Sequence, residues 1–280
     1  MKKIKFVIIT GCSTGIGYAT AKYLKQKKFS VIASCRNIKD VKKLSKEFDY
    51  SIQLDTISSS SIKKAHILIK KIVKNDLVYG IFCNAGYGQF GAVEDLTRDL
   101  ICEQFETNIF GHIELINLFI PLMRKQNEGR IIFNSSVLGL VSLPFSSAYN
   151  ATKFAMEAFA RSLRLELNRT NIKVSLIEPG PIEADFNINA LKNLKRININ
   201  NSVYKKKYNK MIKYLEHGRD IFTLPALSVA KKVHIALKSK KPKTQYFVTL
   251  PTYVLSYLRI LPNPIFENFL SLLDNQRKNK

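Results

Sequence analysis

The sequence predicts one α/β domain in which a doubly wound parallel sheet carries helices on both faces. Short runs of β-branched residues alternate with helical patterns along the 280 residues, as in parallel sheets crossed by helices. The opening run, Lys5–Ile9, is almost entirely apolar, which is typical of a central strand buried on both faces. The chain is 46% hydrophobic and shows no linker-like shift in composition, so residues 1–280 are expected to form a single domain.

The predicted elements follow in order along the chain. Seven β-branched runs bounded by turn residues are predicted as strands, at Lys5–Ile9, Ser30–Ser34, Ser51–Leu54, Val78–Phe82, Arg130–Asn134, Lys173–Ile177 and Gln245–Val248. Apolar residues at helical spacing predict helices between them, at Gly15–Lys27, Ile38–Phe48, Ser59–Lys74, Leu100–Arg124, Ser147–Asn168 and Leu227–Lys238. A C-terminal extension over about 250–280 follows the last strand.

One long connection, between Pro181 and Pro225, interrupts the alternation and far exceeds ordinary loop lengths. Within it, four apolar residues at helical spacing predict a short amphipathic helix; they are Tyr204, Tyr208, Met211 and Leu215. One interpretation is a helix that simply packs on the body of the domain. Its place after the carboxyl end of a strand, where open α/β sheets bind ligands, favours a substrate lid over about 183–224.

The formal net charge of +24 is unusually high and raises the question of a nucleic-acid partner. The lysines are spread over several amphipathic segments and do not form one run interleaved with aromatics, so no nucleic-acid binding is predicted. No stretch approaches the ~20 apolar residues that span a bilayer. The nearest, Tyr246 to Leu258, is interrupted by Pro251, and peripheral membrane contact through it stays an alternative.

The cysteines and the N-terminus indicate a reducing compartment. The four cysteines show neither CxxC spacing nor a partnered histidine cluster, so no metal and no disulfide framework is predicted. The apolar run near the N-terminus is interrupted by Lys5 and ends at Thr10-Gly11 without a cleavage site, which favours a first strand over a signal peptide. A cytoplasmic protein is therefore expected.

The turn between the first strand and the first helix is the first candidate binding site. Gly11 allows a tight turn, Gly15 lets backbone approach a pyrophosphate, and Gly17 permits close packing of helix on strand. The N-terminus of the helix faces the negative charge of the ligand. A dinucleotide site is therefore predicted, and the turn also contributes Ser13, Thr14 and Ile16.

The end of the second strand indicates which dinucleotide is bound. It reads Ser34-Cys35-Arg36-Asn37, without the acidic residue that bonds the ribose hydroxyls of NAD. Arg36 is placed to pair with a 2′-phosphate. The sequence therefore favours NADP(H).

Tyr149 and Lys153 are the strongest indication of chemistry. They stand four residues apart in a predicted helix and so share one face. A positive charge beside a tyrosine favours the phenolate and lowers the pKa from about 10. Tyr149 is therefore predicted to donate or accept a proton near neutral pH.

These motifs resemble those of the short-chain dehydrogenase/reductase superfamily over nearly the whole chain. The glycine turn matches TGxxxGxG as Thr10 to Gly17, and Tyr149 with Lys153 matches YxxxK. The resemblance implies further cofactor residues, namely Asp55, Asn84, Ala85, Gly86, Pro179, Gly180 and Ile182. It also implies that Asn108 and Ser136 join Tyr149 and Lys153 as catalytic residues. The family's first NNAG asparagine is Cys83 here, and a frequent threonine after its PG motif is Ala184.

The family pattern implies a role for each catalytic residue. Ser136 would steady the substrate oxygen, and Tyr149 would exchange a proton with it. Lys153 would lower the tyrosine pKa and bond the nicotinamide ribose, and Asn108 would hold a water that links Lys153 to solvent. By resemblance, homodimers or homotetramers would form through the helices at Leu100–Arg124 and Ser147–Asn168.

The segment from Ser175 to Ile182 is most similar to bacterial NADP-dependent aldehyde reductases, which in turn resemble retinol and 17β-hydroxysteroid dehydrogenases. Apolar residues are expected to wall the substrate cleft, which favours a small apolar carbonyl or alcohol substrate over a sugar or a hydroxy acid; they are Tyr87, Phe90, Leu138, Leu140, Val141, Leu143 and Phe145. The reduction of apolar aldehydes or ketones is the function expected first. Two alternatives stay open: oxidation of retinol-like or steroid-like alcohols, and a non-catalytic NADPH-binding sensor on the same fold.

Overall fold

The structure, a computed structural model, describes residues 3–183, 186–217 and 221–277. Seven parallel strands form its main sheet in the order β3-β2-β1-β4-β5-β6-β9. They are β1 (Lys5–Ile9), β2 (Ser30–Cys35), β3 (Tyr50–Gln53), β4 (Leu77–Cys83), β5 (Gly129–Asn134), β6 (Ile172–Glu178) and β9 (Gln245–Phe247). Each lies within one residue of its predicted bounds. The predicted doubly wound parallel sheet is confirmed.

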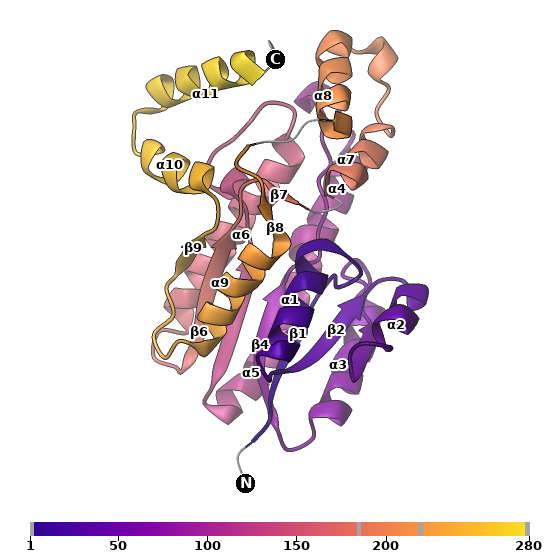
Figure 1. The fold of residues 1–280 in the computed structure, drawn as a ribbon, viewed down its shortest axis with the longest axis vertical. Helices are drawn as coiled ribbons and strands as arrows, with labels where there is room; N and C mark the ends of the chain where they lie inside the picture. The colour runs from indigo at the N-terminus through magenta and orange to yellow at the C-terminus, as the bar shows by residue number, and fades with distance from the viewer. Residues whose placement is uncertain (1–2, 184–185, 218–220, 278–280) are drawn as a thin grey trace.

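Helices cover both faces of this sheet. In the described residues they are α1 (Gly15–Gln26), α2 (Ile38–Leu44), α3 (Ser59–Val73), α4 (Arg98–Phe105), α5 (Gly111–Gln126), α6 (Ser147–Glu166), α7 (Phe186–Leu194), α8 (Lys205–His217), α9 (Ala226–Lys238), α10 (Leu250–Leu258) and α11 (Asn263–Arg277). Figure 1 shows α1 and α9 side by side against the sheet. It also shows α8 and α11 beyond the carboxyl ends of the strands, at the end of the molecule opposite the N-terminus.

The strand side chains alternate between two hydrophobic layers. Phe6 and Ile8 of β1 contribute to the layer shared with α3, α5 and α6, and Val7 and Ile9 contribute to the layer shared with α1, α2 and α9. This two-residue period follows from the pleat of a strand. Strand β1, apolar on both sides, lies inside the sheet between β2 and β4. The chain changes its winding direction between β1 and β4, and open α/β sheets bind ligands outside the carboxyl ends of the strands at such a point.

Two helical predictions differ from the structure. The helix predicted over Leu100–Arg124 is two helices, α4 and α5, joined by a π-helical turn at Glu106–Phe110. The helix predicted at Ile38–Phe48 ends at Leu44. Pro251, which stands within the apolar stretch from Tyr246 to Leu258, lies in the first turn of α10, where a missing N–H costs nothing.

The long connection after β6 holds two helices, where the sequence predicted one. Short strands β7 (Ile182–Glu183) and β8 (Leu224–Pro225) pair in parallel at its base. Between them, α7 precedes the predicted amphipathic helix, which is α8. Ala184 lies outside the described residues.

Candidate functional site

The glycine turn lies at the carboxyl end of β1. Gly11 and Gly15 adopt φ angles of +71° and +58°, a conformation that glycine reaches without steric cost. At Gly17 a β-carbon would lie 2.1 Å from the Gly11 carbonyl oxygen, so only glycine fits. The turn therefore brings backbone close to the N-terminus of α1, whose first N–H groups have no partner within the helix. Such a terminus suits a phosphate group.

Residues after β4 hold this turn in place. Asn84 Nδ2 donates to the Thr10 carbonyl oxygen at 2.9 Å and to that of Gly11 at 3.2 Å. The Thr10 hydroxyl accepts from the backbone N–H groups of Asn84 and Ala85 at 2.8 and 2.9 Å. Asn134 of β5 donates to Asn84 Oδ1 at 3.0 Å. Hydrogen bonds thus join the carboxyl ends of β1, β4 and β5.

Cys83, which replaces the first asparagine of the family motif, lies inside the sheet. Its side chain is fully buried in the layer shared with α3 and α5. Burial raises the pKa of its thiol well above the ordinary value. The position is therefore one of apolar packing, which explains why a cysteine is accommodated there.

The two residues predicted for the adenosine end lie on neighbouring strands. Arg36 is exposed directly after β2, and its backbone carbonyl accepts from Gln53 at 3.0 Å. Asp55 follows β3 and caps the next turn, where its carboxylate accepts from the N–H of Ile57 at 3.2 Å. Within the described residues, no acidic side chain stands between Arg36 and Asp40.

Asn108 sits in the π-helical turn, and its side chain is fully engaged. Its amide donates to the Tyr87 carbonyl oxygen and to the Thr152 hydroxyl, both at 3.1 Å, and accepts from the N–H of Tyr87 at 3.2 Å. The extra residue of a π turn, a common feature of functional sites, lets α4 and α5 place this side chain between β4 and α6. Through these hydrogen bonds Asn108 connects the loop after β4 with α6.

His112 is a residue of this region that sequence analysis missed. Its Nδ1 lies 3.1 Å from the Asn108 carbonyl oxygen and its Nε2 lies 3.1 Å from the Thr10 hydroxyl. Complete burial lowers the pKa of the ring to about 4, so it is neutral near pH 7. It links the π turn to the glycine turn. The spacing of four residues from Asn108, which places both residues on one helix face, was the signal in the sequence that could have indicated His112.

Ser136, Tyr149 and Lys153 converge at the carboxyl end of β5. The Ser136 hydroxyl accepts from the N–H of Leu138 at 3.1 Å, and Ser136 acts on Tyr149 to lower the pKa of its hydroxyl. Lys153 Nζ donates to the Asn134 carbonyl oxygen at 2.6 Å and lies 5.4 Å from the centre of the Tyr149 ring. All three are at most 9% exposed. The structure thus brings together three residues that the sequence singled out from two separate segments.

The predicted direction of the Tyr149 pKa is wrong. Burial raises the pKa of Tyr149 to about 12, although Ser136 acts in the opposite sense. Burial likewise lowers the pKa of Lys153 to about 8. Desolvation penalises the charged form of each group. In both cases it outweighs the opposing effect of the neighbouring side chains, Ser136 for Tyr149 and Glu157 for Lys153.

An aromatic cluster surrounds Tyr149. The ring of Phe186, at the start of α7, lies 5.4 Å from the Tyr149 ring, and Phe90 lies 6.3 Å from it. Phe90 and Phe186 meet edge to face at 6.1 Å. Phe186 was missed by the sequence analysis, because only tertiary packing brings it to the tyrosine.

The predicted lid helix α8 packs on the body of the domain. Tyr208 is fully buried, donates to Asp95 at 2.7 Å and accepts from the Ala92 N–H at 2.7 Å. Met211 packs against the same cluster. Phe145 meets the Tyr208 ring at 5.4 Å.

Four other residues predicted to wall the substrate cleft, Leu138, Leu140, Val141 and Leu143, belong to a hydrophobic cluster with α11. Leu140 and Val141 are buried against α11, with Leu138 and Leu143 beside them. The carbonyl oxygen of Pro179 accepts from the N–H of Val137 at 2.7 Å, which ties the loop after β6 to the loop after Ser136. Gly180 and Ile182 follow in the same loop.

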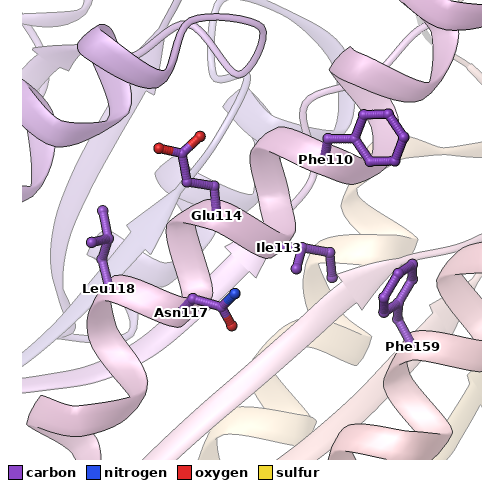
Figure 2. A pocket seen from close by; sticks show the side chains of 6 residues that line it. All are labelled: Phe110, Ile113, Glu114, Asn117, Leu118 and Phe159. Atoms are coloured by element: carbon purple, nitrogen blue, oxygen red, sulfur yellow. The ribbon is translucent and has the colours of Figure 1, made fainter.

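An open hollow lies on α5 and α6, on the outer surface of the domain. Figure 2 shows Phe110, Ile113 and Phe159 together on one side of it, and Glu114, Asn117 and Leu118 continue along α5. Phe110 and Phe159 are 49% and 43% exposed. These are the two segments predicted to form a homodimer contact.

Over residues 3–183, 186–217 and 221–277, no cluster of three or more acidic, histidine or cysteine side chains is arranged for a metal ion. Within that same part of the chain, no helix has the length and apolar composition needed to cross a membrane.

The sequence pattern of the short chain dehydrogenases matches residues 5–195. The chain belongs to this family of oxidoreductases. The uncharacterized oxidoreductase YbbO of Escherichia coli (strain K12) is 38% identical over 269 residues, which cover 95% of this chain and 94% of the relative. Human 17-beta-hydroxysteroid dehydrogenase type 1 is 30% identical over 285 residues, covering 96% and 85%.

The fold has close neighbours among solved structures. A short-chain dehydrogenase from Streptomyces avermitilis superimposes with a TM-score of 0.79 over all of both chains, at 21% identity. The superfamily resemblance inferred from the motifs is therefore confirmed, including its likeness to 17β-hydroxysteroid dehydrogenases.

Proposed function

We propose that the protein is an NADP(H)-dependent oxidoreductase that reduces apolar aldehydes or ketones to alcohols. The observation that carries the proposal is the buried convergence of Ser136, Tyr149 and Lys153 at the carboxyl end of β5, with Lys153 beside the Tyr149 ring. Hydroxyl groups of Ser136 and Tyr149 that converge in this way can both reach one substrate oxygen. The family membership and the apolar surroundings of Tyr149 add support.

The turn around Gly17 fits a dinucleotide. At Gly17 a β-carbon would collide with the Gly11 carbonyl oxygen, so the glycine lets the turn pack tightly against the start of α1. Backbone N–H groups at that helix N-terminus are available for phosphate. Gly11, Ser13, Thr14, Gly15 and Ile16 would hold the pyrophosphate, Asp55 the adenine, and Asn84, Ala85, Gly86, Pro179, Gly180 and Ile182 the nicotinamide end. When bound, the dinucleotide supplies the hydride.

Arg36 is the residue proposed to select NADP(H). It is exposed after β2, where a guanidinium can form two bonds to a 2′-phosphate. Fold neighbours have been solved with NADP⁺ and with NAD, so the fold does not choose between them. The choice is proposed on Arg36 and on the lack of an acidic residue beside it.

The side chains divide the chemistry among them. With a pKa of about 12, Tyr149 is protonated at neutral pH and can donate its proton to a carbonyl oxygen during reduction. The Ser136 hydroxyl would donate a hydrogen bond to the same oxygen as negative charge develops there. Lys153, as a buried cation, would stabilise the phenolate that remains. Asn108 would keep the π turn in register with α6.

The decisive experiment is an NADPH oxidation assay over a panel of aldehydes and ketones. We expect turnover that prefers apolar substrates. Tyr149→Phe keeps the ring and removes the proton donor, so it should lower kcat at least about 100-fold while NADPH binding stays near wild type. Residual activity within tenfold of wild type would rule out the assigned role of Tyr149.

Two other functions make different predictions in the same assay. An alcohol dehydrogenase of the retinol or steroid type, which the 17-beta-hydroxysteroid dehydrogenase relative favours, would turn over such alcohols with NADP⁺ more efficiently than any carbonyl. A non-catalytic sensor would bind NADPH and turn over neither. The intact set of Ser136, Tyr149 and Lys153, buried together, argues against the sensor.

We also propose that two copies associate through the hollow on α5 and α6. Phe159→Glu places a charge on this exposed apolar surface and should convert the oligomer to a monomer in sedimentation analysis. Ile235→Glu is the matched control, because Ile235 is 49% exposed on α9, on the opposite face of the sheet. An unchanged mass for Phe159→Glu would contradict this interface.

A further inference from the structure

A chain of hydrogen bonds runs from the glycine turn to the backbone of Tyr149. The Thr10 hydroxyl lies 3.1 Å from His112 Nε2, and His112 Nδ1 lies 3.1 Å from the Asn108 carbonyl oxygen. The Asn108 amide donates to the Thr152 hydroxyl at 3.1 Å, and that hydroxyl donates to the Tyr149 carbonyl oxygen at 2.8 Å. Thr10, His112, Asn108 and Thr152 are at most 1% exposed. These bonds are therefore shielded from water, where hydrogen bonds are strong.

The contacts of the Thr10 hydroxyl fix which nitrogen of His112 carries the hydrogen. The hydroxyl oxygen accepts from the N–H groups of Asn84 and Ala85 at 2.8 and 2.9 Å, which occupies both of its lone pairs. Thr10 therefore has only its own hydrogen left to share with His112. The alternative acceptor, the Phe82 carbonyl oxygen, lies farther away at 3.4 Å and already accepts from the backbone N–H of Thr10. His112 Nε2 is thus an acceptor.

The other ring nitrogen of His112 must then carry the hydrogen. Burial, opposed by the hydrogen bond to Asn108, lowers the pKa of the ring to about 4, and the charge of Lys153 acts in the same sense as burial. The ring is therefore neutral near pH 7 and has a single N–H group. With Nε2 as the acceptor, this N–H is on Nδ1 and donates to the Asn108 carbonyl oxygen. All four bonds of the chain then point the same way, from Thr10 toward Tyr149.

We propose that His112 is a positioning residue that couples the dinucleotide-binding turn to the catalytic tyrosine, through an Nδ1–H tautomer that joins Thr10 to Asn108. This inference rests on the proposed function, in which the glycine turn binds the dinucleotide and Tyr149 exchanges the proton. Hydrogen bonds aligned in one direction strengthen one another. Removal of the ring between them separates the glycine turn from α6.

The tautomer is measured on the unmodified protein. NMR of nitrogen-labelled histidine distinguishes a protonated ring nitrogen from an unprotonated one, and His112→Phe identifies the signals. We expect a protonated Nδ1 and an unprotonated Nε2 for His112 at pH 7. If His112→Phe does not fold, replacing the other three histidines one at a time assigns the remaining signal. A protonated Nε2 overturns the proposal, because Thr10 could not donate to it.

Kinetics test the positioning role. His112→Phe keeps a ring and removes both nitrogens, so kcat should fall, by up to about 100-fold if Tyr149 is displaced by about an ångström. Substrate KM should stay near the wild-type value, a split that a loss of packing alone would not produce. His66→Phe makes the same change at a half-buried histidine of α3 and should keep the wild-type kcat. An unchanged kcat in folded His112→Phe contradicts the proposal.

NADPH affinity tests whether the two ends of the chain communicate. Thr152→Val removes one hydroxyl at the α6 end and keeps the branched shape. It should weaken NADPH binding, and its effect should shrink by at least about twofold in the His112→Phe background, as for residues of one hydrogen-bond network. Thr20→Val is the matched control. It removes a buried hydroxyl of α1 that has no hydrogen-bond partner among the described residues, so its effect should be equal in both backgrounds.

Failure of the coupling and failure of the proposed function give different results. The tautomer and the NADPH measurements need no turnover, so an inactive wild type that shows both expected results would refute the proposed function and leave the hydrogen-bond chain standing. An active enzyme in which Thr152→Val and His112→Phe have independent effects on NADPH affinity would refute the coupling alone.

Discussion

The edge of the sheet around the glycine turn and the segments that cover Tyr149 are held in different ways. Around the turn, the contacts are made to the backbone. Gly17 lies against the Gly11 carbonyl oxygen, and the side chains of Asn84 and Thr10 form hydrogen bonds with main-chain groups. Over Tyr149, side chain meets side chain, with Phe90 and Phe186 in ring contacts. The first region has little freedom to adjust, whereas aromatic side chains can repack.

This difference matches the tasks proposed for the two regions. A dinucleotide is a constant ligand, so its site can be built from backbone that admits one geometry. A substrate site formed by side chains on a long insertion changes its specificity when a few residues are replaced. We therefore expect the two regions to respond very differently to equally small substitutions.

The largest expected effect is that of Gly17→Ala, which adds one methyl group at the glycine turn; the same addition is tested beside Tyr149 with Gly88→Ala. In Gly17→Ala the new β-carbon would lie 2.1 Å from a backbone oxygen, and the backbone shift that relieves it costs roughly 1–3 kcal/mol. NADPH affinity should drop by about one to two decades, as measured by fluorescence titration.

Gly88→Ala is the matched variant on the substrate side. There the β-carbon would meet the ends of the Phe186 and Phe90 rings, at 2.8 and 3.0 Å, and rings can move. Its NADPH affinity should stay at the wild-type value while substrate KM changes. The comparison fails if Gly88→Ala weakens NADPH as much as Gly17→Ala does.

Arg36→Asp is expected to have the next largest effect. A charge-assisted hydrogen bond contributes roughly 1.5–3 kcal/mol, so the preference for NADPH over NADH should fall by about one to two decades. Arg169→Asp makes the same change of charge on an exposed residue before β6, at the opposite edge of the sheet, and should leave the preference intact. A wild type that uses NADH as well as NADPH would contradict the role of Arg36.

Much of this architecture could be predicted from sequence because it follows from local patterns. Strand β1 is apolar at every inward position of both faces, and the strands as a group fall within one residue of their predicted bounds. Ser136, Tyr149 and Lys153 converge because parallel strands end at one edge of the sheet. A motif with fixed spacing carries that geometry.

What the sequence did not reveal depends on tertiary contacts. The π turn at Asn108 interrupts a helix whose apolar pattern is continuous. The pKa of Tyr149 depends on burial, which outweighs the opposing effect of Ser136. Phe186 acquires its aromatic partners only when the insertion packs against α6. Leu140 and Val141 pack beneath α11, a helix that no local pattern had indicated.

The smallest and most informative effect concerns which part of the insertion touches the substrate. The sequence favoured the apolar face of α8, but Met211 packs on the body of the domain, whereas Phe186 of α7 contacts Tyr149. In the wild type, catalytic efficiency should rise with aldehyde chain length, because each buried methylene contributes up to ~0.8 kcal/mol, or tens-fold for three. Phe186→Ala should flatten this series, and Met211→Ala should leave its slope unchanged.

Stability separates the two variants further. Met211→Ala removes part of the cluster around Tyr208, so it should lower Tm without altering the chain-length slope. Phe186→Ala should alter the slope at a NADPH affinity equal to that of the wild type, because its ring contacts Phe90 and Tyr149 and not the glycine turn. If Met211→Ala flattens the series and Phe186→Ala does not, then α8 is the substrate-facing helix, and the aromatic cluster around Tyr149 serves packing alone.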